Sequence, residues 1–122
     1  MTTWITICDT CKREGWTAES EGRTDGENFA DLIEAATNGS VRTRRFSCLM
    51  GCSRACNVTI QAASKISYSL GDFEPDSDAA IAVVSFAKLH NESKNGQVPY
   101  RQWPQPIKGH FVSRHPPLPA ED

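Results

Sequence analysis

Five cysteines in the first half of a 122-residue chain constrain this sequence more than any other feature. They form a C-x-x-C and a C-x-x-x-C-x-x-x-C motif, at Cys8, Cys11, Cys48, Cys52 and Cys56. An odd number of thiols cannot pair completely within one chain. No signal peptide is visible, so we expect a reducing, cytoplasmic compartment. Clustered thiols there bind metals or do redox chemistry more often than they form structural disulfides.

The composition predicts one domain with a thin hydrophobic core. Leu, Ile, Val and Phe make up only about 19% of the residues, and the length suits a single core. The chain has 13 basic and 15 acidic residues, which argues against a general nucleic-acid binder. No apolar run approaches the roughly 20 residues needed to span a bilayer, so we expect no membrane segment.

Hydrophobic periodicity predicts four strands and two helices. The strands are expected near residues 4–7, 41–46, 58–62 and 66–70, with the last two forming a hairpin. Thr24 and Glu27 resemble a capping box before one helix, and a second helix is expected after Pro75. The order β-α-β-β-β-α predicts an α/β fold, with helices packed on a small mixed sheet.

The end of the chain differs in composition, since six of its seven prolines lie beyond residue 98. Prolines at this density exclude an α-helix. We therefore expect a domain over residues 1–93 and an extended proline-rich arm over 94–122. The arm would pack on the same domain through Trp103, Ile107 and Phe111.

Each cysteine cluster follows a predicted strand. Because parallel strands of a βαβ unit end at the same edge of a sheet, thiols far apart in sequence could converge on one centre. An all-thiolate site favours zinc, copper(I) or an iron–sulfur cluster. Four basic residues flank the clusters and could offset the ligand charge, namely Lys12, Arg13, Arg45 and Arg54. We interpret His90, His110 and His115 as surface or hydrogen-bonded histidines.

A thiol–disulfide oxidoreductase that uses Cys8 and Cys11 is a further hypothesis, because a C-x-x-C in an α/β chain is typical of that class. A reactive C-x-x-C normally opens a helix, whose N-terminus lowers the thiol pKa. Here the residues after Cys11 lead into a predicted loop. The redox-enzyme interpretation is therefore kept as an alternative.

The segment from Cys48 to Tyr68 resembles the second half of thioredoxin-like [2Fe–2S] ferredoxins, in which a C-x-x-x-C loop leads into a hairpin and a C-terminal helix. Nearly the whole chain is also similar to a small bacterial family of predicted metal-binding proteins. That family has the same two cysteine motifs and two late motifs, present here as Gly96-Gln97-Val98-Pro99 and Arg114-His115-Pro116.

The resemblance implies a thioredoxin-like fold that holds a [2Fe–2S] cluster and carries single electrons to a redox protein partner, without being an enzyme. It also implies a homodimer. The expected ligands are Cys8, Cys11, Cys48 and Cys52, with Cys56 as a spare or exchange ligand. The alternative is a protein that binds zinc or another divalent metal through the same cysteines, in a structural role or with a metal-handling partner.

Overall fold

The computed structural model describes residues 2–17, 23–50 and 52–119, and the side chain of Cys52 lies outside the described part. Three 3-10 turns, Cys52–Arg54, Tyr100–Gln102 and Gln105–Ile107, connect longer elements. Those elements are β1 (Trp4–Cys8), α1 (Asp25–Ala36), β2 (Arg42–Phe46), β3 (Val58–Gln61), β4 (Ser67–Leu70), α2 (Ser77–Glu92) and β5 (Phe111–His115).

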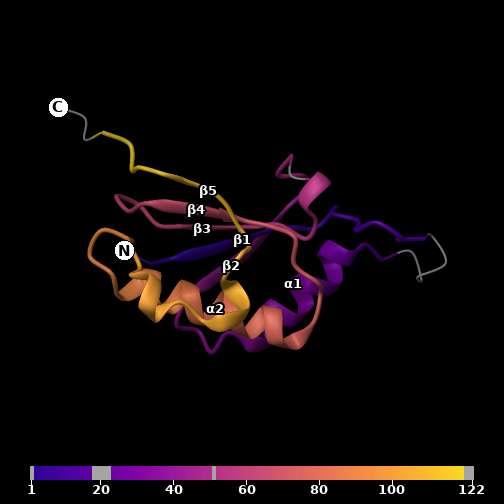
Figure 1. Cartoon of the computed structure of the whole chain (residues 1–122), viewed down its shortest axis with the longest axis horizontal. Coiled ribbons are helices and arrows are strands. Elements are labelled where there is room, and N and C mark those ends of the chain that lie inside the picture. Colours follow the sequence, from indigo (N-terminus) through magenta and orange to yellow (C-terminus); the bar gives the residue numbers. More distant parts are fainter. Residues whose placement is uncertain (1, 18–22, 51, 120–122) are drawn as a thin grey trace.

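The five strands form one mixed sheet in the order β2-β1-β3-β4-β5. β1 and β2 are parallel, and every other neighbouring pair is antiparallel. Both helices lie on the same side of this sheet (Figure 1). The predicted β-α-β-β-β-α order is confirmed, and the arrangement is consistent with a thioredoxin-like α/β fold.

Alternating apolar residues of the strands form the floor of the core. Ile5 pairs with Ile60, and Ile60 pairs with Tyr68, so the three side chains share the face toward the helices. The helices cover this face with buried apolar residues, among them Phe29, Ile33, Val83, Phe86 and Ala87. Each fully buried Ile or Phe side chain stabilises the fold by roughly 1.5–3 kcal/mol relative to exposure.

Both helices begin where capping residues predict. The Thr24 side chain accepts a hydrogen bond from the Glu27 backbone N–H, and the Glu27 carboxylate accepts one from the Thr24 N–H, which makes a complete capping box. The Asp76 side chain accepts a hydrogen bond from the backbone N–H of Ala79 at the start of α2. These bonds satisfy backbone donors that a helix N-terminus otherwise leaves unpaired.

The proline-rich arm contributes a strand that the sequence analysis did not predict. Residues Phe111–His115 pair with β4 in antiparallel fashion, with an irregularity between Ser69 and Leu70. Ile107 is fully buried, and Trp103 and Phe111 pack against the core. Within the described ranges, no helix is long and apolar enough to cross a membrane.

The second face of the sheet carries polar side chains. Thr6 pairs with Arg44 on one side and with Thr59 on the other, and Thr59 pairs with Ser69, so these residues share the face away from the helices. In the described part of the chain, neither α1 nor α2 covers this face (Figure 1). We call it the open face.

Candidate functional site

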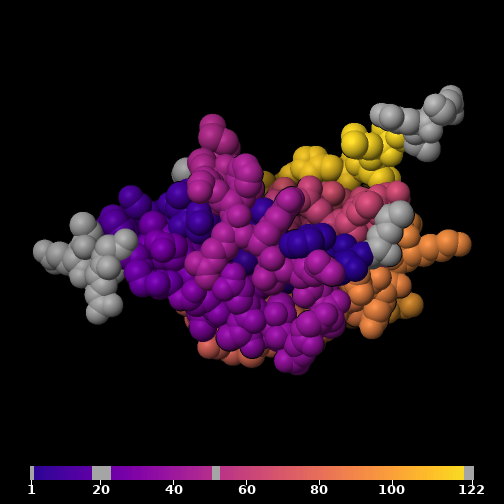
Figure 2. Space-filling view, turned by 180° about the vertical axis from the view of Figure 1, so that it is seen from behind, coloured from indigo at the N-terminus to yellow at the C-terminus, as the bar shows by residue number. Residues whose placement is uncertain are grey.

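Both cysteine clusters reach the same end of the sheet, as the parallel arrangement of β1 and β2 predicts. Cys8, the last residue of β1, pairs with Phe46, the last residue of β2. The segment after β2 stays beside the residues that follow β1, because the Thr10 hydroxyl donates to the Ser47 carbonyl at 3.5 Å. The backbone N–H of Cys8 donates to the carbonyl of Asn57, the residue after Cys56, at 3.2 Å. Figure 2 shows this segment as a magenta projection above the indigo N-terminal part of the chain.

The C-x-x-C segment packs directly against the first turn of α1. The Gly26 N–H donates to the carbonyl of Cys11 at 3.0 Å, and the Thr24 hydroxyl donates to the carbonyl of Asp9. A Cβ at Gly26 would overlap the carbonyl oxygen of Cys8, so only glycine fits there. The cysteines thus lie beside a helix N-terminus, although the sequence separates them from α1 by a loop.

The thiols of Cys8 and Cys11 are both buried and hydrogen-bonded to each other. Burial raises the pKa of Cys8, but hydrogen bonds from the Cys11 thiol, the Leu49 backbone and Thr10 outweigh it, so this pKa lies below the ordinary thiol range. Burial raises the pKa of Cys11, and its bond to Cys8 and the charge of Cys8 raise it further. The pair is therefore asymmetric, with the negative charge favoured on Cys8.

Asn57 is a site residue that the sequence analysis missed. Its side-chain amide donates a hydrogen bond to the Cys11 sulfur at 2.8 Å. Asn57 directly follows Cys56 and precedes β3. This position between a cysteine and a strand was the only sequence signal that could have identified Asn57 as a site residue. A donor aimed at sulfur stabilises thiolate over thiol.

Cys56 is the member of the second cluster that lies in the same electrostatic environment. It is fully buried, and its backbone N–H donates to the carbonyl of Phe73 at 3.0 Å. Burial raises the pKa of Cys56 to about 12, the charges of Asp25 and Cys8 add to this rise, and Arg13 opposes it. Cys56 in turn raises the pKa of Cys11.

Cys48 is placed differently from these three cysteines. It is half-buried, with a φ of 126°, and its thiol is 3.8 Å from the sulfur of Met50. Cys52 opens the 3-10 turn Cys52–Arg54, and its side chain is not described. Among the side chains that the structure describes, no group of three or more Cys, His, Asp and Glu residues is placed so that it could hold a metal ion.

The flanking basic residues divide into two sets. Arg13 lies close enough to affect Cys56 electrostatically, and it contacts Glu74 at 3.8 Å. Arg54 pairs with Asp72 at 3.4 Å. Arg45, in contrast, points toward α1, where it pairs with two carboxylates, those of Asp31 and Glu34, at 2.7 Å each.

The histidines are engaged outside the cysteine site. The buried His90 ring lies between the Thr3 hydroxyl and the Ile66 carbonyl. His110 contacts the carbonyl of Gly71 at 2.8 Å, and His115 contacts the Ser113 hydroxyl at 3.2 Å. These contacts agree with the interpretation of hydrogen-bonded or surface histidines.

One buried oxygen near the thiols has no hydrogen-bond partner. It is Oδ1 of Asp9, and among the described residues it is the single buried side-chain nitrogen or oxygen in this condition. Asp9 lies between Cys8 and Cys11 in the sequence, so the unsatisfied oxygen belongs to the same segment as the paired thiols. Buried polar atoms normally have partners, and this one therefore marks a place that another group could satisfy.

Comparison with known proteins gives a family for the chain. Neither a search of curated proteins nor a search of solved structures finds a match. A family profile described as "Protein of unknown function (DUF1636)" matches residues 5–117. This range contains both helices, all five cysteines and all five strands except Trp4, the first residue of β1. The chain therefore belongs to the DUF1636 family.

Proposed function

We propose that this protein binds a metal centre through cysteine thiolates at the end of β1, and that the centre is a [2Fe–2S] cluster used for one-electron transfer. Cys8, Cys11 and Cys56 would supply three ligands after a shift of their side chains, because no three described groups are already placed to hold a metal ion. The segment with Cys48 and Cys52 would supply the fourth ligand. The observation that carries the proposal is the burial of these three thiols in one electrostatic environment.

The chemistry of the donors fits such a centre. Thiolates are the ligands that iron–sulfur clusters and Cys₄ zinc sites use. The Leu49 N–H and the Asn57 amide already donate to sulfur, which is the contact that tunes thiolate ligands. Arg13 would offset part of the negative charge near Cys56.

A bound cluster supplies a reversible one-electron couple. The protein's part is to hold the sulfurs and to exclude water from them. Cys8, Cys11 and Cys56 are fully buried, so their sulfurs would be shielded from solvent. The partly exposed segment around Cys48 and the exposed Met50 would be the surface nearest the centre, where a redox protein partner could approach.

The first experiment is a visible spectrum and a metal and sulfide analysis of protein purified without oxygen. We expect iron and labile sulfide in equal amounts, close to two of each per chain. A colourless protein with stoichiometric zinc, whose cobalt form absorbs in the visible range, would instead establish the zinc-binding alternative. Protein that binds neither iron nor zinc would refute the proposal.

Single Cys→Ser variants then assign the ligands. Cys8→Ser, Cys11→Ser and Cys56→Ser should each lose most of the bound metal, and so should one of Cys48→Ser and Cys52→Ser. The other of these two is the matched control and should keep its metal. Full metal content in Cys56→Ser would contradict the ligand set proposed here and restore Cys56 to the role of a spare.

A second function is supported by one observation, the asymmetry of the Cys8–Cys11 pair. In a thiol–disulfide oxidoreductase, the Cys8 thiolate attacks a substrate disulfide to form a mixed disulfide and releases one substrate thiol. The Cys11 sulfur then loses its proton and displaces the second substrate thiol, which leaves a Cys8–Cys11 disulfide. Metal-free protein should reduce a disulfide substrate, and Cys8→Ser should abolish this activity while Cys48→Ser retains it.

A further inference from the structure

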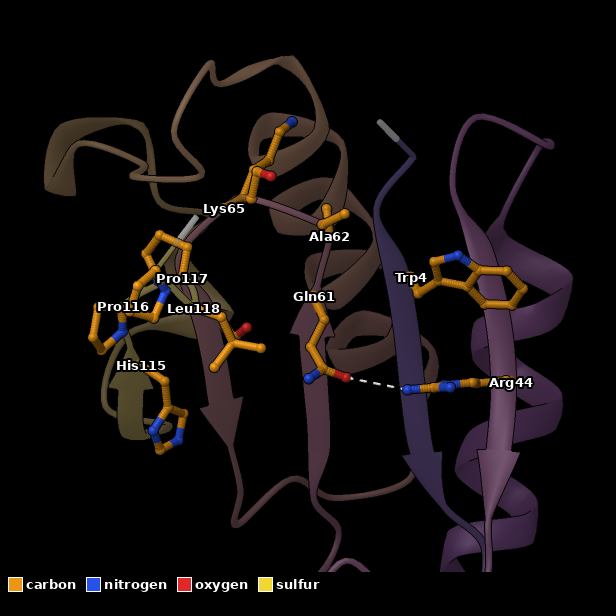
Figure 3. Close-up of a pocket in the computed structure, with 13 residues that line it drawn as sticks. Trp4, Arg44, Gln61, Ala62, Lys65, His115, Pro116, Pro117 and Leu118 are labelled. Carbon is orange, nitrogen blue, oxygen red and sulfur yellow. Dashed lines mark hydrogen bonds between the residues drawn. The ribbon is translucent and has the colours of Figure 1, made fainter. Parts of the chain in front are cut away.

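A separate cavity lies on the open face, at the end of the sheet away from the cysteines. β1 runs from Trp4, which lines the cavity, to Cys8 in the thiol site. The cavity has a volume of about 720 Å³ and lies between β1 and the arm that follows β5 (Figure 3). This volume is within the roughly 300–1,000 Å³ of typical small-ligand sites.

Arg44 is held in place at one wall of this cavity. Its Nε donates to the Thr6 hydroxyl at 2.7 Å and its Nη2 donates to the Gln61 carbonyl oxygen at 3.3 Å. The two acceptors come from β1 and β3, so the guanidinium extends across two neighbouring strands (Figure 3). The Cζ atom of Arg44 is also 6.0 Å from the centre of the Trp4 ring. A guanidinium has five N–H donors, and these bonds use two of them.

The charge of Arg44 is not neutralised within the described part of the chain. No ion pair of the described residues includes Arg44. None of the described residues that line the cavity is Asp or Glu. The same is true of all five strands, whereas both helices carry carboxylates. A fixed cation without a counter-ion in a cavity without carboxylates favours an anionic ligand.

Other polar residues also line the cavity. The side-chain amide oxygen of Gln61 faces Arg44. The amide nitrogen of Gln61 therefore lies on the side of β4 and the arm (Figure 3). Ser64, Ser67 and His115 belong to the same lining. Lys65 contributes differently, because its ammonium donates to the carbonyls of His90 and Asn91 at the end of α2.

The remaining walls are apolar. Trp4 lies at one side of the cavity, with its ring over β2, and Pro116, Pro117 and Leu118 lie at the other side (Figure 3). The Leu118 side chain is 91% exposed, although it belongs to the cavity lining. An inorganic anion would leave this apolar surface in water, whereas an organic ligand would cover it.

We propose that this cavity binds an organic oxyanion, that is, a ligand with a carboxylate or phosphate group attached to an apolar body. The free N–H groups of Arg44 would bond the oxyanion, because a guanidinium matches two oxygens of such a group. The Gln61 amide would donate a further bond, and the apolar body would lie against Pro116, Pro117 and Leu118. This site uses none of the cysteines and does not depend on the proposed metal centre.

The experiment is an NMR titration of the ¹⁵N-labelled protein with benzoate and with phenyl phosphate, which separates the two kinds of oxyanion. At least one should give saturable shifts of the Trp4 indole N–H and the Arg44 Nε–H. Neutral benzamide and inorganic phosphate should bind more weakly than the better of these probes. Arg44→Gln should weaken binding of that probe at least about tenfold, since a charge-assisted bidentate contact is lost.

Arg114→Gln is the matched control, since Arg114 lies on β5 beside Tyr68 and outside the cavity lining. The Arg114→Gln variant should bind that probe with the same affinity as the unmodified protein. Failure of both probes to give saturable shifts would overturn the proposal. So would an equal loss of affinity in Arg44→Gln and Arg114→Gln, because binding would then follow net charge and not this site.

Discussion

At the scale of single residues, Gly26 links helix α1 to the cysteine site. Its Cα lies so close to the Cys8 carbonyl that a side chain cannot be added without moving backbone. We predict that Gly26→Ala lowers the free energy of unfolding by about 1–3 kcal/mol, the usual range for overpacking, despite alanine's better helix propensity. Urea denaturation measures this, with exposed Asn28→Ala as the control in the same turn. A more stable Gly26→Ala protein would contradict the packing described here.

His90 gives the fold a pH-dependent component. Its Nε2 bonds the Ile66 carbonyl at 2.6 Å and must carry the hydrogen, so Nδ1 accepts from the Thr3 hydroxyl at 2.8 Å. Burial lowers the pKa of His90, and nearby Lys65 lowers it further, whereas the bond to Ile66 opposes the shift. The folded protein therefore takes up this proton at lower pH than the unfolded chain, whose histidine pKa is about 6.5.

The sign of the effect follows from this difference. Above about pH 6.5 neither state is protonated at His90, and its contribution to stability is complete. As the pH falls below 6.5 toward the lower folded pKa, stability should decrease by up to about 1.4 kcal/mol per pH unit. Urea midpoints between pH 5 and 7.5 should show this component in the unmodified protein and in His115→Asn, but not in His90→Gln. An unchanged pH slope in His90→Gln would refute the assignment.

At the scale of elements, the predictable parts were those with a local signal. Thr24 and Glu27 predict the start of α1, and the alternation at Val58 and Ile60 predicts β3. Both signals come from residues that are close together in the sequence. β5 was missed because its five residues lie between prolines and pair with β4, about 45 positions earlier. The direction of Arg45 was missed for a related reason. Its partners Asp31 and Glu34 belong to another element.

The capping box of α1 gives a prediction at this scale. Thr24→Ala removes the acceptor for the Glu27 N–H and the hydroxyl that bonds the Asp9 carbonyl. We expect a loss of about 1 kcal/mol of unfolding free energy, within the usual range for an N-cap. Thr24→Ser keeps the oxygen and should restore most of the stability. Equal stability of the alanine and serine variants would show that the cap contributes nothing measurable.

At the scale of the whole molecule, the cysteine site joins parts of the fold that are distant in sequence. β1 supplies Cys8, and the segment before β3 supplies Cys56 and Asn57. The first turn of α1 is hydrogen-bonded to the C-x-x-C segment. The sequence predicted the meeting of the two clusters, because parallel strands end at one edge. It could not predict that Cys56 is buried with Cys8 and Cys11 while Cys48 faces Met50, since the path of the loop decides this.

Because the proposed centre would tie these distant segments together, its removal should destabilise the entire domain. A ligand that binds only the folded state adds RT ln(1 + [L]/Kd) to stability, which is about 2.7 kcal/mol at a hundredfold excess over Kd. For a domain of this size, a loss of that magnitude corresponds to a fall in Tm of roughly 10 °C. Calorimetry of metal-loaded and chelator-treated protein measures the difference. A variant with serine at positions 8, 11 and 56 is the control, and chelator should not change its Tm. If the loaded and stripped proteins melt at the same temperature, the metal does not connect these segments, and the thiols serve the fold only as buried side chains.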